Sequence, residues 1–119
     1  IMKYETLKAT LLNYPDSSLS FPFDEITPVF KVAKKMSALI GTTGGSLSIN
    51  LKCDPEDALI LRSQFDAIHP GYHMNKDHWN TVNLDGSIDT NILKKLIDDS
   101  YILVVRTMSL REQKRLGVT

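Results

Sequence analysis

The stretch LSINLKCDPEDALILRSQF, Leu47 to Phe65, predicts a strand that leads directly into a helix. From Leu47 to Lys52 apolar and polar side chains alternate, which is typical of a strand with one buried and one solvated face. Asp54 then fits a helix N-cap and Pro55 the first helical position. The expected inner face of this helix consists of Ala58, Leu61 and Phe65.

Before this stretch the sequence predicts a helix and a β-hairpin. The helix repeats apolar residues at helical spacing and should stop before Pro15, because the residue before proline avoids helical dihedrals. The hairpin pairs Val29 to Val32 with Met36 to Ile40 across a turn at Ala33-Lys34-Lys35. The positions that define the first helix are Tyr4, Leu7, Leu11 and Tyr14.

Three connecting segments of this first half carry expectations of their own. Asp16 to Ser20 is expected to be a turn-rich joint, and Thr42 to Gly45 a flexible loop. In Phe21-Pro22-Phe23 the two aromatic rings are expected to fasten a loop to the core.

After Phe65 we expect one more strand and one long helix, separated by an irregular loop. Ile68 to Gly71 should break the second helix, and Trp79 to Leu84 has strand character. Asp89 is the expected cap of a helix whose period continues through Ile102 to Val105. Its outer face should carry i,i+4 pairs among Lys94, Lys95, Asp98 and Asp99. A short basic helix is expected from Ser109 to Leu116, with Arg111, Lys114 and Arg115.

This order of elements favours an α+β fold, a two-layer sandwich in which helices pack on one face of an antiparallel sheet. A chain of 119 residues fits a single domain, residues 1–119. The single Cys53 excludes an internal disulfide and suits a reducing compartment. No run reaches the roughly 20 apolar residues of a membrane span, and no signal-peptide pattern opens the sequence, so a cytoplasmic location is expected.

The charged residues are balanced. The sequence contains fourteen Lys and Arg residues and fourteen Asp and Glu residues, which gives a formal net charge of zero. Nucleic-acid binding requires a clustered positive surface, and a neutral chain can have one if its acidic residues lie elsewhere. Composition therefore neither supports nor excludes nucleic acid as a partner.

Four blocks of sequence resemble the MmcQ/YjbR family of small bacterial proteins. They are SFPFDEITPVFKV (Ser20 to Val32), LKCDPEDALILR (Leu51 to Arg62), PGYHMNKDHWNTVNLDG (Pro70 to Gly86) and LIDDSYILVV (Leu96 to Val105). The resemblance implies a compact α+β domain similar to bacterial frataxin, a CyaY-like fold. It also implies a DNA-binding role through a double-wing arrangement, although a fold alone does not fix a function.

The residues offer little for catalysis or metal binding. His69, His73 and His78 lie close in sequence, but Pro70-Gly71 interrupts the helix that an i,i+4 pair would need, so hydrogen bonds to loop backbone are the favoured role. Cys53 next to a helix N-terminus could have a lowered pKa, yet a lone small thiol is more often a packed core residue. We expect neither an enzyme nor a cofactor nor a bound metal.

Recognition is the remaining function class. The polar and aromatic segment after Pro70 suits a binding surface, and Lys34, Lys35 and Lys52 add cations that could meet phosphates. Exposed rings could stack on bases, although Tyr72 and Trp79 could equally be core residues and the Asn residues turn caps. The predicted DNA-contacting set is Lys34, Lys35, Lys52, Tyr72, His73, Asn75, Lys76, His78, Trp79 and Asn80. The alternative is a small-ligand or protein-binding module that uses the loop of residues 70–80 as a pocket wall.

Overall fold

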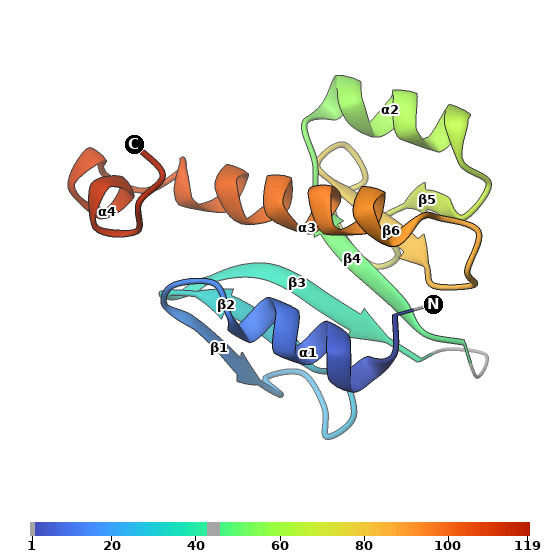
Figure 1. Ribbon diagram of the computed structural model, residues 1–119, viewed down its shortest axis with the longest axis horizontal. Helices are drawn as coiled ribbons and strands as arrows, with labels where there is room; N and C mark the ends of the chain where they lie inside the picture. Colours follow the sequence, from blue (N-terminus) through green and yellow to red (C-terminus); the bar gives the residue numbers. More distant parts are fainter. Residues whose placement is uncertain (1, 43–45) are drawn as a thin grey trace.

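The computed structural model describes residues 2–42 and 46–119 (Figure 1). The first half contains α1 (Tyr4–Leu12), β1 (Ser17–Ser20), β2 (Val29–Val32), β3 (Lys35–Gly41) and β4 (Ser48–Lys52). The second half contains α2 (Pro55–Gln64), β5 (Ile68–Pro70), β6 (Trp79–Asn83), α3 (Thr90–Val105) and α4 (Leu110–Arg115). The predicted α+β architecture is confirmed.

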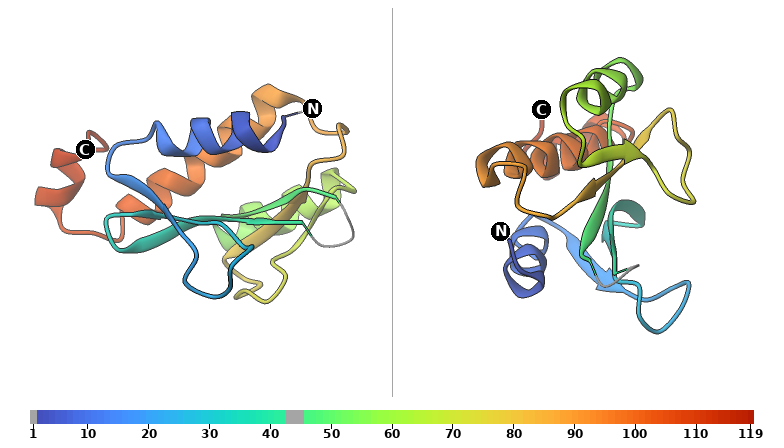
Figure 2. Two further views of the ribbon diagram at one scale, coloured as in Figure 1. Left: turned by 90° about the horizontal axis from the view of Figure 1, so that it is seen from below. Right: turned by 90° about the vertical axis from the view of Figure 1, so that its right-hand side faces the viewer.

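The strands form one antiparallel sheet in the order β1-β2-β3-β4-β6-β5. α1 and α3 lie together on one side of this sheet, while the loops that follow β1 and β5 project from the other side (Figure 2). α2 packs beside β5 at the far edge. The result is a helix layer on a sheet layer.

The core lies between these layers. Strand alternation places Phe30, Ala38, Ile40, Ile49, Leu51 and Val82 on the helix-facing side, each nearly or fully buried. α3 contributes Leu93 and Ile97 to the same cluster, and α1 contributes Leu7 and Leu11. Ser100 ties α3 to the sheet, because its Oγ donates to the Ser37 carbonyl at 2.8 Å and accepts from the Lys52 amide at 2.9 Å.

The helix boundaries follow the predicted caps. The Asp54 side chain accepts a hydrogen bond from the Glu56 amide at the start of α2, and Asp89 accepts one from the Asn91 amide at the start of α3. The β-branched run Ile102 to Val105 is helical, as predicted. Of the expected surface pairs, Lys95 and Asp99 form one at 2.8 Å. Ser109 caps the short α4.

Two segments expected to lack regular structure form strands. Ser17 to Ser20 pairs with β2 as an edge strand, so the expected turn-rich joint is wrong for these residues. Ile68 to Pro70 pairs with β6 as the opposite edge strand. Both segments are short, and their pairing depends on a neighbouring strand, which local sequence does not reveal. Of the expected loop at Thr42 to Gly45, residues 43–45 lie outside the described residues.

Two expectations about burial are also wrong. Phe21 and Phe23 are 46% and 68% exposed, so these rings do not fasten their loop to the core. Asn50, expected on the wet face of its strand, is buried. On that face its Oδ1 accepts a hydrogen bond from Thr81 Oγ1 of the neighbouring strand, and Thr81 Oγ1 accepts one from the Tyr72 amide at 3.0 Å. The backbone at Tyr72 therefore lies over this part of the sheet.

Candidate functional site

Most of the predicted DNA-contacting residues lie at the same end of their strands, spread across the sheet from the β2–β3 turn to the loop after β5. The β2–β3 turn lies at this end, because Val32 pairs with Lys35. β4 ends there at Lys52, which pairs with Trp79 at the beginning of β6. The loop from Gly71 to His78 leaves β5 and returns to β6 at the same end. The sequence could not show this, because only the strand register sets which strand ends coincide.

Lys35 connects the β2–β3 turn to the C-terminal part of the chain. Its Nζ donates to Thr107 Oγ1 at 2.8 Å and to the Thr107 carbonyl at 3.4 Å, at the corner between α3 and α4. Lys34 beside it is exposed. In the turn Ala33 has a φ of 54°, a left-handed conformation that few non-glycine residues adopt. The turn therefore holds Lys35 against the start of the C-terminal segment, with Lys34 exposed beside it.

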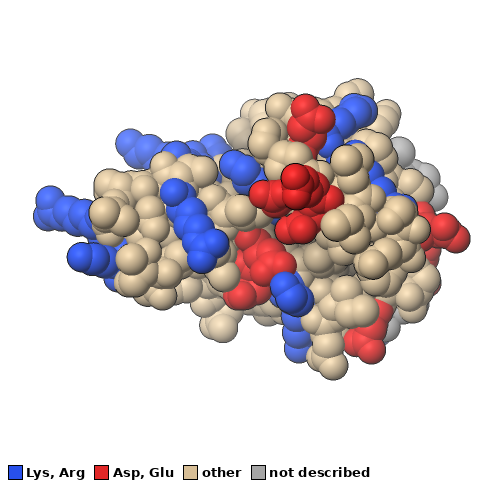
Figure 3. Space-filling model, turned by 90° about the horizontal axis from the view of Figure 1, so that it is seen from above, with Lys and Arg blue, Asp and Glu red and all other residues tan. Residues whose placement is uncertain are grey.

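The C-terminal segment adds further cations at this place. We call the group of Lys34, Lys35, Arg106, Arg111 and Lys114 the basic end; all five residues are exposed. Within residues 2–42 and 46–119, none of the five forms an ion pair. In Figure 3 the charged residues visible where α4 lies are Lys and Arg, whereas Lys, Arg, Asp and Glu are mixed over the rest of this face.

Arg115 is the cation of this region that is neutralised. Its Nη2 lies 2.8 Å from Asp16 Oδ2, and its Nε lies 2.7 Å from Glu112 Oε2. These carboxylates raise the pKa of Arg115 and hold its guanidinium in place. Arg115 thus fastens α4 to the beginning of β1, while Arg111 and Lys114 stay free of carboxylates among the described residues.

The loop from Gly71 to His78 is held at its base. The Gly71 amide donates to the Trp79 carbonyl at 2.9 Å, and a Cβ atom at Gly71 would lie 2.8 Å from Trp79 Cβ. Tyr72 is 62% exposed, and its ring lies 4.0 Å from that of His73, centroid to centroid. His73 has a φ of 58°. The loop thus presents two adjacent rings on a fixed backbone.

Arg62 of α2 fastens this loop from behind. Its Nε donates to Asn80 Oδ1 at 2.7 Å, and its Nη2 donates to the Trp79 carbonyl at 3.3 Å and also to the Lys76 carbonyl. Sequence reasoning did not single out Arg62, because the partners of its guanidinium lie at least 14 residues away. Only the contact between α2 and β6 reveals its role.

The other predicted DNA-contacting residues differ in whether their side chains are exposed to a partner. Asn75, Lys76 and His78 are exposed; Asn75 Oδ1 accepts from the Asp77 amide at 3.0 Å, which shapes the turn. Lys52 and Trp79 are partly buried. Asn80 is 3% exposed and faces the helix side of the sheet, so its predicted place on a DNA-contacting surface is corrected.

Cys53 is not an activated thiol. Burial and the neighbouring Asp57, Asp54 and Asp99 raise the pKa of Cys53 to about 11, so the lowered pKa considered for a residue near a helix N-terminus is wrong here.

Within the described residues, no three His, Cys, Asp or Glu side chains are arranged to hold a metal ion. None of the helices in residues 2–42 and 46–119 combines the length and the hydrophobicity that a membrane span requires.

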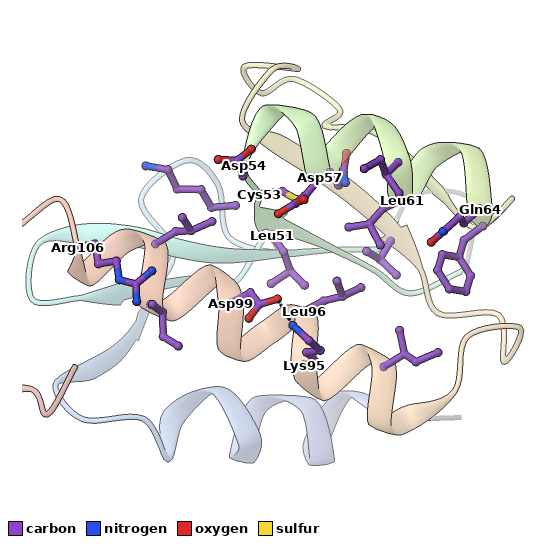
Figure 4. Close-up of a pocket in the computed structure, with 18 residues that line it drawn as sticks. Leu51, Cys53, Asp54, Asp57, Leu61, Gln64, Lys95, Leu96, Asp99 and Arg106 are labelled. Atoms are coloured by element: carbon purple, nitrogen blue, oxygen red, sulfur yellow. Dashed lines mark hydrogen bonds and ion pairs between the residues drawn. The ribbon is translucent and has the colours of Figure 1, made fainter. Parts of the chain in front are cut away.

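A cavity of about 760 Å³ lies between α2 and α3 (Figure 4). The alternative expectation was a pocket with the loop of residues 70–80 as its wall. Of that loop only Asn80 lines this cavity; Tyr72, His73 and Trp79 do not.

Comparison with known proteins agrees with the architecture. The chain is 40% identical over 113 residues to the uncharacterised protein YbdF of Escherichia coli O157:H7, which covers 95% of this chain and 93% of YbdF. It is 35% identical over 86 residues to the uncharacterised protein YjbR of Escherichia coli K12, covering 72% and 73% of the two chains. The crystal structure of DR2400 from Deinococcus radiodurans superposes with a TM-score of 0.87 at 40% identity, covering 97% of this chain and 88% of that one. A protein from Pseudomonas syringae superposes with a TM-score of 0.75 at 30% identity, over 87% and 99% of the two chains. The family model described as YjbR matches residues 12–103, and the chain therefore belongs to the YjbR family.

Proposed function

We propose that this protein binds DNA, and that the basic end supplies the phosphate contacts. The observation that carries the proposal is the segregation of charge in a molecule with no net charge. Five exposed cations from two stretches about 70 residues apart in sequence lie together around the Lys35–Thr107 contact. Such a cluster is the electrostatic feature that phosphate binding requires.

The shape of this region supports the same role. The β2–β3 turn and α4 both project from one end of the molecule (Figure 1), so a duplex lying across that end could meet both. Phosphate contacts would fix the position of the duplex without reading its sequence. Tyr72 and His73 are exposed on the loop after β5, across the sheet from the β2–β3 turn, and are the proposed candidates for base contact.

We propose binding and not catalysis as the activity of this surface. Cys53 is the lone thiol of the sequence, and its raised pKa disfavours the thiolate that a nucleophile needs. A DNA-binding surface needs neither a cofactor nor a reactive side chain.

Salt dependence of binding tests the proposal. Fluorescence anisotropy with a labelled duplex should give a logarithmic affinity that falls linearly with the logarithm of salt concentration, with a slope of about −4 to −5 if all five cations contact phosphates. Single-stranded DNA in a parallel titration would show whether base contacts add affinity. No binding to either DNA at low salt would refute the proposed function.

Charge reversal tests the location. The triple variant Lys34→Glu, Arg111→Glu, Lys114→Glu should reduce the magnitude of the salt slope by about 3 and weaken binding more than tenfold at low salt, roughly. The matched control, Lys3→Glu, Lys8→Glu, Lys94→Glu, changes net charge equally at α1 and at the first half of α3, away from the basic end. Equal losses in both variants would mean that binding follows net charge, and the basic end would be the wrong surface.

A further inference from the structure

The cavity between α2 and α3 has an apolar part. Leu51 and Val82 come from the sheet beneath it, Leu61 from α2, Phe65 from directly after α2, and Leu96 from α3. Ile60 and Ile92 also line it and are 51% and 37% exposed. A concave site of this volume with apolar walls has the dimensions of a small-molecule site.

The other part of the cavity is lined by carboxylates. Asp54 and Asp57 lie at the beginning of α2 and Asp99 on α3; in Figure 4 Asp54 and Asp57 lie beside Cys53, and Asp99 lies next to Lys95. Asp99 is paired with Lys95 at 2.8 Å, whereas Asp57 forms no ion pair within the described part of the chain. Lys52, Lys95 and Arg106 also line the cavity, so its lining holds three cations and three carboxylates. Lys95 pairs with Asp99 and the Asp54 side chain accepts a hydrogen bond from the Glu56 amide, which leaves Asp57, among the described residues, as the lining carboxylate available to a ligand cation.

A second and independent feature of this cavity is Asn80. Asn80 is 3% exposed, and its Oδ1 accepts a hydrogen bond from Arg62 Nε at 2.7 Å. Its Nδ2 has no hydrogen-bond partner among the described residues. A buried donor without a partner is costly, about 1–3 kcal/mol. Because Asn80 lines the cavity, a ligand with an acceptor atom is a natural partner for this donor.

From these features we propose that the cavity between α2 and α3 binds a small organic amine: an aryl or alkyl body, an ammonium group, and a carbonyl oxygen close to it. The body lies against Leu61, Phe65 and Leu96, and the ammonium group lies near Asp57. The carbonyl oxygen accepts from Asn80 Nδ2 once small side-chain movements expose this atom. The proposal does not depend on DNA binding. Of the residues that line the cavity, Arg106 is the one that also belongs to the basic end.

A matched series of probes tests each part of this ligand. Phenylalaninamide has all three groups, phenethylamine lacks the carbonyl, 3-phenylpropanamide lacks the ammonium group, and 3-phenylpropanoate carries a negative charge instead. Titrations followed by ¹H–¹⁵N NMR at about pH 6.5 keep the amines protonated. A ligand of this size is expected to bind with a Kd on the order of a millimolar.

We expect phenylalaninamide to bind most tightly and the carboxylate most weakly. Signals of Leu61 and Leu96 should shift with both amines, whereas the Asn80 side-chain NH₂ signals should shift further with phenylalaninamide than with phenethylamine. Failure of all four probes to shift these signals would overturn the proposal. Equal binding of the neutral amide or the carboxylate would also overturn it, because the cavity would then be merely apolar.

The Asp57→Asn variant tests the carboxylate. Asp57 is exposed and outside the core, so the variant should fold, and it should bind phenylalaninamide roughly 3- to 5-fold more weakly. Asp66→Asn is the matched control, because Asp66 is an exposed carboxylate that does not line the cavity. An unchanged Kd in Asp57→Asn, or the same loss in Asp66→Asn, would refute the assigned role of Asp57.

Discussion

Removing the side chain of Arg62 should loosen the loop that carries Tyr72 and His73. Arg62 donates to Asn80 Oδ1 at 2.7 Å, to the Trp79 carbonyl at 3.3 Å and to the Lys76 carbonyl. In Arg62→Ala all three bonds are lost at once. Asn80, which is buried and already has an unpartnered Nδ2, would then have no partner for its Oδ1 either.

The magnitude follows from these contacts. Each bond contributes about 1 kcal/mol net, and an unsatisfied buried acceptor costs about 1–3 kcal/mol. Arg62 is partly exposed, and water can replace the bonds to the loop carbonyls, so the full sum is an upper limit. We therefore expect Arg62→Ala to lower the free energy of unfolding by about 2–4 kcal/mol.

Urea denaturation at equilibrium measures this change, and hydrogen exchange locates it. The amides of Gly71 and His78, which bond to the Trp79 and Asn75 carbonyls, should lose protection more than the amides of the β2–β3 hairpin. Arg111→Ala is the control, since Arg111 is exposed and forms no ion pair within the described residues, and it should change stability by less than about 0.5 kcal/mol. A loss below about 1 kcal/mol in Arg62→Ala, with unchanged exchange in the loop, would refute this role of Arg62.

Three further predictions concern single residues. Burial and nearby carboxylates raise the pKa of Cys53 to about 11, which lowers the fraction of reactive thiolate. Alkylation by iodoacetamide at about pH 8 should therefore be roughly a hundredfold slower in the folded protein than in urea. Equal rates would contradict the burial of this thiol. Burial and then Asp98 raise the pKa of Tyr14 to about 12, so the folded state retains a proton that the unfolded state loses near pH 10. The contribution of Tyr14 to stability is therefore present below pH 10 and should be lost between about pH 10 and 12. Urea titrations across this range measure the decline in the free energy of unfolding, and Tyr14→Phe should lack the part that is due to Tyr14. Gly71→Ala should lower the free energy of unfolding by about 1–3 kcal/mol, because the added Cβ would lie 2.8 Å from Trp79 Cβ and 2.9 Å from the Trp79 carbonyl oxygen. An unchanged free energy of unfolding in urea denaturation would show that the loop moves to accommodate the methyl group without loss of stability.

The local sequence determined those elements whose signal is local. The Asp54-Pro55 start of α2, the Asp89 cap of α3 and the Val29 to Ile40 hairpin were all predicted within a residue or two of their observed bounds. Caps and apolar periods act over a few residues, and this is why they can be read from the sequence. The α+β class followed from the order of these elements.

The tertiary structure decided what depends on residues distant in sequence. Ser17 to Ser20 and Ile68 to Pro70 became strands because they pair with β2 and β6, and Asn50 is buried because Thr81 and the Tyr72 backbone lie against it. The lysines of the β2–β3 turn meet the cations near α4 through contacts such as Lys35–Thr107, 72 residues apart. The cavity with Asn80 exists because α2 packs against β5 while α3 packs against β4 and β3, which leaves a gap between the two helices over β4 and β6. Such long-range juxtapositions arise from strand register and helix packing, which the spacing of residues along the chain does not encode.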